Sequence, residues 1–104
     1  IRSASFAYWK GQIAPYSRSS EVVSSMDIFP TLSRLAGLQL PTDRVYDGRD
    51  MTKVLLSAAG RSEHKFLFFY GGCGTQVITK ENHPSAVRHG RWKAHFCTGP
   101  GLGG

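Results

Sequence analysis

The 104-residue sequence predicts a mixed α/β unit. Three features carry this expectation: an apolar stripe with helical spacing behind Asp27, a continuous apolar run at 66–70, and an alternating run at 91–96 that follows a turn signal. A chain of this length suits one domain, and a hydrophobic content of 40% favours a folded protein over a disordered one.

The first apolar run, Phe-Ala-Tyr-Trp at 6–9, predicts a short buried strand that ends at Lys10 and Gly11. The following stretch, 12–20, contains Pro15 and several serines and therefore indicates a loop. Regular structure is expected to resume in the segment that contains Asp27.

That segment predicts the clearest helix of the chain. Asp27 is a suitable N-cap, and Pro30 falls in the first turn, where its missing N–H has no partner to lose. The apolar positions recur at helical spacing and predict a stripe against the core: Ile28, Leu32, Leu35 and Ala36. Gly37 suits a left-handed position just past the helix, and Leu38 can fold back on the last turn.

The chain then predicts an extended connection from Leu40-Pro41 and a turn at Asp47-Gly48. Asp50 can cap a second short helix that ends near Gly60. The apolar positions of this helix are Met51, Val54 and Leu55. The run 66–70, bounded by Lys65 and a Gly-Gly pair, predicts a strand buried on both faces.

The last predicted element is a hairpin at 86–96 with its turn at His89-Gly90. Its second strand alternates, which predicts one buried and one basic face. The buried face would carry Trp92, Ala94 and Phe96, and the basic face Arg91, Lys93 and His95. Val77 and Ile78 suggest an edge strand, and the Gly-rich tail at 99–104 is expected to be disordered.

A net charge of +6 favours anionic partners, although the thirteen basic residues are spread along the chain and most are expected on a solvated face. The densest basic patch makes Arg88, Arg91 and Lys93 candidate contacts for a phosphate or sulfate. The alternative, favoured by the residues themselves, is the solvated face of an amphipathic hairpin. Because the hairpin aromatics are expected in the core, no nucleic-acid partner is expected.

No motif for hydrolysis or phosphate binding is present: the sequence has no G-x-S-x-G, H-E-x-x-H or Gly-rich phosphate loop. Two groups of side chains could in principle hold a metal ion: His95 with Cys97, and the carboxylates of Asp43, Asp47 and Asp50. We expect neither group to be a metal site. Cys73 and Cys97 can pair with each other or with partners outside this chain.

No apolar run approaches the ~20 residues that a bilayer-spanning helix needs, so no membrane span is expected in this chain. A signal peptide is not expected either, because no apolar stretch of the required length follows the first residues. The chain begins with Ile1 instead of Met, which favours a fragment or a processed product.

Blocks spread over residues 6–98 resemble the sulfatase family, in particular its arylsulfatase and steroid sulfatase branch. These blocks are 6–9 (FAYW) with 11–15 (GQIAP), 26–32 (MDIFPTL) with 35–37 (LAG), 47–50 (DGRD), 61–68 (RSEHKFLF), and 86–88 (AVR) with 92–96 (WKAHF). The resemblance implies a fragment of an alkaline-phosphatase-like fold. Residues 1–70 would then be the C-terminal part and sheet end of the large mixed-sheet domain. Residues 71–98, with the hairpin at 86–96, would start the small C-terminal antiparallel sheet.

Sulfatases hydrolyse sulfate esters with a formylglycine, made from the Cys or Ser of a C-x-P-S-R motif, beside a calcium ion. Neither Cys73 nor Cys97 lies in such a motif, and the resemblance places the calcium ligands and the catalytic Lys and His upstream of Ile1. No catalytic, cofactor or metal residue is therefore expected in this chain, and we expect the isolated chain to be inactive. Calcium, formylglycine and the sulfate-ester substrate belong to the full-length parent, expected in the secretory pathway or lysosome.

Two alternatives to this reading stay open. The chain can be a small basic module that binds sulfated glycan or nucleic acid through its hairpin, or a non-functional product of a truncated gene.

Overall fold

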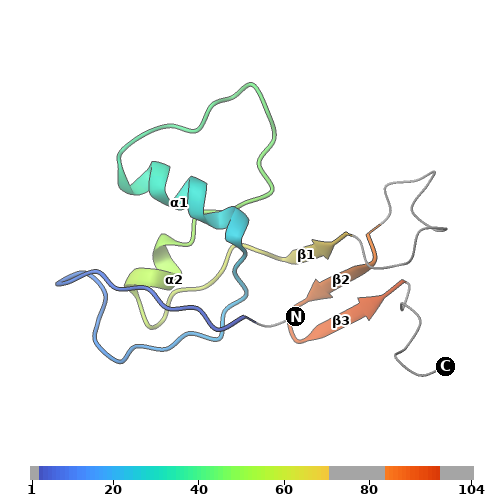
Figure 1. Cartoon of the computed structure of the whole chain (residues 1–104), viewed down its shortest axis with the longest axis horizontal. Coiled ribbons are helices and arrows are strands. Elements are labelled where there is room, and N and C mark those ends of the chain that lie inside the picture. The colour runs from blue at the N-terminus through green and yellow to red at the C-terminus, as the bar shows by residue number, and fades with distance from the viewer. Residues whose placement is uncertain (1–2, 71–83, 97–104) are drawn as a thin grey trace. The chain divides into compact units, whose positions relative to one another are not determined.

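The computed structural model describes residues 3–70 and 84–96 (Figure 1). In chain order its elements are the 3-10 helix η1 (Ser25–Asp27), α1 (Ile28–Leu35), α2 (Thr52–Leu56), β1 (Phe66–Phe69), β2 (Ala86–His89) and β3 (Trp92–His95). They fall into two compact units, Ile1–His64 with the helices and Lys65–Gly104 with the strands. The expected α/β composition is confirmed.

The helical segment begins one turn earlier than predicted, because η1 precedes α1. Ser24 is the residue that caps it: its Oγ accepts the N–H of Met26 at 3.3 Å, and Asp27 Oδ2 accepts the N–H of Ser24 at 2.7 Å. The Asp27 side chain makes no capping bond to α1. Asp27 thus holds the predicted N-cap position of α1, but the capping bond expected from its side chain is absent, since its carboxylate is directed to other partners.

The end of α1 follows the sequence closely. Gly37 has φ 71°, and its N–H donates to the carbonyl of Arg34 at 3.0 Å. The N–H of Leu38 donates to the carbonyl of Ser33 at 2.8 Å, so the two bonds form a Schellman motif. The predicted left-handed Gly37 is confirmed, as is the place of Pro30 in the first turn.

The apolar stripe of α1 does not face a core among the described residues. Ile28 is 50% exposed and Leu32 59% exposed, whereas Pro30 and Thr31 are the buried residues of the helix. The predicted burial of the stripe is wrong for the chain as described. The physical reason is that α1 is fastened to the rest of its unit by polar bonds from its first turns, and these bonds turn Thr31 inward.

Two glycines, one before and one after α2, lie where the backbone of another segment comes too close for a side chain. Asp47-Gly48 is not a turn, which corrects the prediction; instead, a Cβ on Gly48 would lie 2.0 Å from the carbonyl oxygen of Met26. The N-cap of α2 is Met51 and not the predicted Asp50, although Asp50 Oδ1 accepts the N–H of Thr52 at 2.9 Å and so satisfies a donor in the first turn. The helix ends earlier than expected, and Gly60 packs where a Cβ would lie 1.8 Å from the carbonyl oxygen of Lys53.

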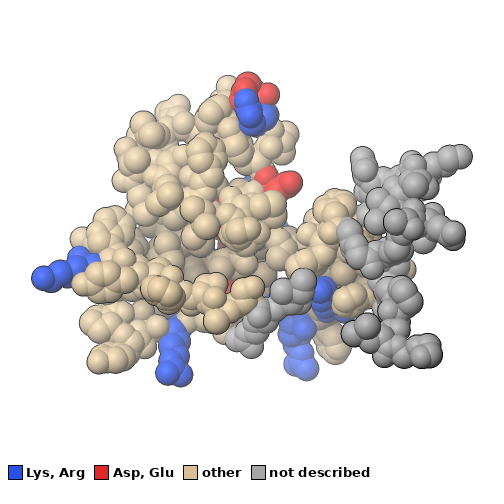
Figure 2. Space-filling model, viewed as in Figure 1, with Lys and Arg blue, Asp and Glu red and all other residues tan. Residues whose placement is uncertain are grey.

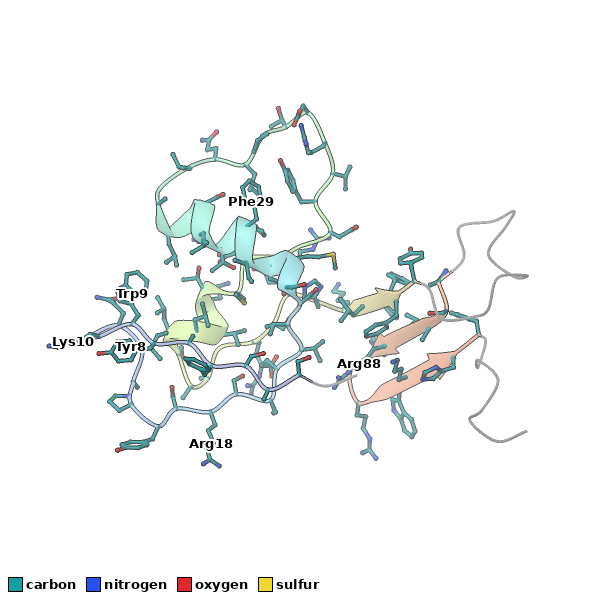
Figure 3. All side chains as sticks on the ribbon, in the orientation of Figure 1. Tyr8, Trp9, Lys10, Arg18, Phe29 and Arg88 are labelled. Carbon is teal, nitrogen blue, oxygen red and sulfur yellow. The ribbon has the colours of Figure 1, made fainter. Side chains whose placement is uncertain are left out.

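The predicted strand at 6–9 is wrong. The segment has no regular structure and leads into a turn in which the carbonyl of Trp9 accepts the N–H groups of Gln12 and Ile13, both at 3.0 Å. Phe6 and Tyr8 are exposed, and Figure 3 shows Tyr8, Trp9 and Lys10 on this loop. A strand needs the backbone of a neighbour, and none of the described residues offers one.

The three strands form an antiparallel sheet in the order β1-β2-β3 (Figure 1). His89 pairs with Trp92, so the hairpin loop is Gly90-Arg91, with Gly90 at φ 55°. The predicted turn at His89-Gly90 is off by one position, because a two-residue loop of this kind needs its positive φ at the first residue. The shift removes Arg91 from the strand and leaves the alternation of β3 intact.

Burial in the sheet also differs from the prediction. Phe66 and Phe68 of β1 are half exposed, so the expectation of a strand buried on both faces is wrong. Trp92 and Phe96 are exposed as well, so the hairpin does not bury the face assigned to them. Among the described side chains of the sheet, only that of Ala86 is buried, with 2% of its surface exposed. A small three-stranded sheet buries its two faces only where other helices or strands pack against them.

Several predictions lie outside the described residues: the edge strand at Val77 and Ile78, the state of Cys73 and Cys97, and the tail at 99–104. The assignment of 1–70 and 71–98 to two domains of a parent fold stays a prediction. Among the residues that the structure describes, no helix is long and apolar enough to cross a membrane.

Candidate functional site

The three predicted anion contacts lie on the β2–β3 hairpin. Arg88 pairs with Lys93 across the two strands, so these two side chains share one face of the sheet. Arg91 lies in the two-residue loop instead. The structure thus brings two of the three predicted residues together, and the third lies outside the paired strands.

Each of the three cations has a contact of its own. Arg88 donates from Nε to the carbonyl of Gly90 at 3.0 Å. The guanidinium of Arg91 lies 5.1 Å from the ring centroid of Trp92, and the ammonium of Lys93 lies 4.1 Å from that of Phe69.

These aromatic partners belong to opposite faces of the sheet. Trp92 pairs with His89, which pairs with Phe66, whereas Phe69 pairs with Ala86, which pairs with His95. Arg91 and Lys93 are therefore drawn to different faces. Figure 2 shows Lys and Arg side chains, in blue, exposed on the surface turned to the viewer. The contact with an anion at Arg88, Arg91 and Lys93 stays a prediction, and the geometry does not converge them on one ligand.

A second polar cluster, which the sequence did not single out, surrounds Asp27. Its carboxylate is 1% exposed and accepts three hydrogen bonds. Oδ2 accepts the N–H of Ser24 at 2.7 Å, while Oδ1 accepts the N–H of Arg49 at 2.8 Å and lies 2.7 Å from Nε2 of His64. The imidazole is 5% exposed. A buried carboxylate with this many donors is well satisfied, and it joins three separate segments of the chain.

Thr31 extends the cluster by one turn of α1. Its hydroxyl donates to the carbonyl of Asp27 at 2.6 Å and accepts the N–H of Met51 at 3.0 Å. Asp27 and Thr31 thus hold the backbone of the 49–51 connection against the helix. Close by in the same unit, Glu21 Oε2 accepts the N–H of Ser62 at 2.8 Å, which fixes the segment that carries His64.

The chemistry of this cluster is structural. The bonds to Asp27 come from two backbone N–H groups and one imidazole, and the bonds of Thr31 go to backbone groups. In covalent hydrolysis an Asp–His pair activates a hydroxyl or thiol beside the histidine. The nearest hydroxyl in sequence, that of Ser62, accepts the backbone N–H of His64 at 3.1 Å. The cluster is a clamp between segments.

The carboxylates weighed as a cation site do not converge. Asp43 pairs with the neighbouring Arg44 at 2.7 Å, and this guanidinium lowers the pKa of the Asp43 carboxyl. Asp50 pairs with Arg34 at 3.0 Å and also accepts the N–H of Thr52. Within residues 3–70 and 84–96 no group of three metal-ligating side chains is found. His95 lies on β3, and its expected neighbour Cys97 falls outside the described part.

One half of the Asp27 cluster had a sequence signal. Ser24 and Asp27 fit the capping-box pattern of a Ser followed three residues later by an acid, which predicts their mutual hydrogen bonds. The bond to His64 has no local signal, because it joins residues 37 positions apart.

No family model matches the chain, but comparison with curated proteins finds similar sequences. Rat steryl-sulfatase is 43% identical over 98 residues, or 94% of this chain. Bovine arylsulfatase A is 42% identical over the same share, and an arylsulfatase of Hemicentrotus pulcherrimus is 44% identical over 88% of the chain. This chain is a relative of the sulfatases. The resemblance to their arylsulfatase and steroid sulfatase branch is confirmed.

The matched region is a small part of each sulfatase. The chain spans 16% of rat steryl-sulfatase, 18% of bovine arylsulfatase A and 14% of the Hemicentrotus arylsulfatase. This coverage is consistent with a partial chain. A match over 98 of the 104 residues includes both the Asp27 cluster and the hairpin in the comparison with rat steryl-sulfatase and bovine arylsulfatase A.

Proposed function

We propose that this chain is a scaffold portion of a sulfatase, and that the whole protein hydrolyses sulfate esters. One observation carries the proposal: identity of 42–43% to a steryl-sulfatase and an arylsulfatase extends over 94% of the chain. Agreement over both units favours a common fold and a common role for this segment over a shared short motif.

The proposed role of the segment is to support the catalytic part of the enzyme. The Asp27 cluster supports this role, because its side-chain oxygens accept hydrogen bonds from the backbone N–H groups of Ser24, Arg49 and Met51. The remaining sequence of the proposed parent carries the formylglycine and the side chains that would hold a calcium ion. The formylglycine would supply the nucleophile, and the calcium ion would stabilise the charge on the sulfate oxygens. In this chain neither cysteine lies in C-x-P-S-R, and Asp27, Asp43 and Asp50 have partners of their own.

The alternative of a basic binding module gains no support. Such a module needs cations that converge on one anion, and the contacts of Arg91 and Lys93 draw them to opposite faces of the sheet.

The proposal is tested in two steps with 4-nitrocatechol sulfate and a steroid sulfate as substrates. We expect no turnover from the purified 104-residue chain, and turnover from the product of the complete coding sequence. Replacing the cysteine or serine of its C-x-P-S-R motif by alanine is expected to abolish that turnover. A complete product that is folded, carries formylglycine and cleaves neither substrate would contradict the proposal. Turnover by the isolated chain that survives every purification step would contradict the scaffold role.

A further inference from the structure

One face of the three-stranded sheet presents apolar and aromatic strand residues with no Lys, Arg, Asp or Glu among them, and the guanidinium of Arg91 from the hairpin loop lies 5.1 Å from the Trp92 ring on this face. The register puts Phe66, His89 and Trp92 in one row across the strands, and Phe68, Val87 and Ala94 in the next. We call these six side chains the aromatic face. Its members pack on each other: the rings of Phe66 and His89 lie 4.7 Å apart, and those of Phe66 and Phe68 6.3 Å apart.

The aromatic face is open. Phe66 is 52% exposed, Phe68 50% and Trp92 70%. Three large aromatic side chains that share an exposed face are unusual on the surface of a soluble protein, and such patches mark sites of contact with other protein surfaces. Each would gain stability by burial, because aromatic rings contribute large apolar areas to cores and interfaces.

The opposite face differs in both charge and cover. It carries Arg88, Lys93 and His95, and Ala86 on it is 2% exposed. The Lys93 ammonium lies over the ring of Phe69 on this face. Neighbouring residues of β3 therefore lie on opposite faces: Trp92 belongs to the aromatic face, and Lys93 belongs to the charged one.

We propose that the aromatic face is the surface on which the remainder of a sulfatase chain packs, through an apolar and uncharged surface of its own. This inference rests on the proposed function. The segments of this chain outside the description supply little apolar area, since 1–2, 71–83 and 97–104 hold only Ile1, Val77, Ile78 and Leu102 as large aliphatic side chains. The relatives, in contrast, continue far beyond the matched region, which is 16% of rat steryl-sulfatase. The bulk of such a chain is available to cover the face.

The test is a chimera in which this chain replaces the matched segment of bovine arylsulfatase A. Hydroxyl-radical oxidation, read by mass spectrometry, reports the exposure of Trp92 in the folded chimera and in the isolated chain. We expect roughly tenfold less oxidation of Trp92 in the chimera, because burial removes the ring from water. Should the whole replacement fail to fold, a smaller graft of residues 65–96 provides the same comparison.

A matched pair of variants separates the two faces in the same chimera. Trp92→Glu places a charge in the proposed contact and is expected to reduce the yield of folded chimera by roughly tenfold or more. Lys93→Glu makes the same new side chain on the opposite face, and is expected to leave the yield within about twofold of the parent chimera.

Three results would overturn the inference. One is equal oxidation of Trp92 in the folded chimera and the isolated chain. Another is a Trp92 already protected in the monomeric isolated chain, since another part of this chain would then cover the face. The third is protection that grows with concentration of the isolated chain, which would assign the face to a second copy. Aryl sulfate hydrolysis is measured separately: a folded chimera that protects Trp92 but cleaves no substrate supports the packing surface and counts against the proposed function.

Discussion

His64 Nε2 lies 2.7 Å from Asp27 Oδ1, and the two side chains are 5% and 1% exposed. The pair joins the end of the first compact unit to the start of its helical segment. Because Asp27 also holds Ser24 and Arg49 through their backbone N–H groups, loss of one partner affects the position of the others.

His64→Ala is expected to lower the free energy of unfolding by about 1–3 kcal/mol, because a buried carboxylate loses a donor. Urea denaturation of the chain, followed by far-UV circular dichroism, measures the change. His95→Ala is the matched control, since His95 is exposed on β3. Equal effects of the two substitutions would contradict the role assigned to the Asp27–His64 pair.

Thr31 offers a test of the bond between α1 and the 49–51 connection. Thr31→Val keeps the size of the side chain but leaves the N–H of Met51 without its acceptor, so we expect a loss of about 1–2 kcal/mol. Thr31→Ser retains the hydroxyl and is expected to lose less. Hydrogen exchange of the Met51 amide measures the local effect. Unchanged protection in the valine variant would argue against this bond.

Gly48→Ala tests close approach, since the new Cβ would lie 2.0 Å from the carbonyl oxygen of Met26. The backbone must shift, and we expect a cost above about 2 kcal/mol. Gly37→Ala is the comparison: no atom lies within 4 Å of its Cβ, but φ is 71°. Its expected cost is about 1 kcal/mol, from the left-handed conformation alone. The same urea measurement ranks the two, and a larger loss at Gly37 would reverse the interpretation.

Heparin chromatography tests the hairpin cations. Because Arg88, Arg91 and Lys93 do not converge, Arg88→Ala with Arg91→Ala is expected to shift the eluting salt concentration no more than Lys10→Ala with Arg18→Ala. Both double variants remove two positive charges, and Figure 3 shows Lys10 and Arg18 on the N-terminal segment. A far larger shift for the hairpin variant would restore the predicted anion contact, since a specific site responds to its own residues and not to net charge alone.

Short-range features were predictable because their causes lie within a few residues. Pro30 in the first turn, the left-handed Gly37 and the strand alternation around Trp92 each depend on neighbours along the chain. The wrong predictions involve distant partners. The run at 6–9 forms no strand, because its apolar pattern does not specify a neighbour to pair with. The exposure of Ile28 and Phe68 likewise depends on what packs against them.

The helical segment around Pro30 and Gly37, the hairpin and the relation to sulfatases could be predicted from the amino-acid sequence, because propensities, turn residues and short motifs are properties of the chain itself. The bonds from Asp27 to His64 and Arg49, and the close approach of Gly48 to the backbone of Met26, are seen only in the folded chain. These contacts join residues far apart in sequence, and the loop entropy that opposes them is offset by many groups acting together.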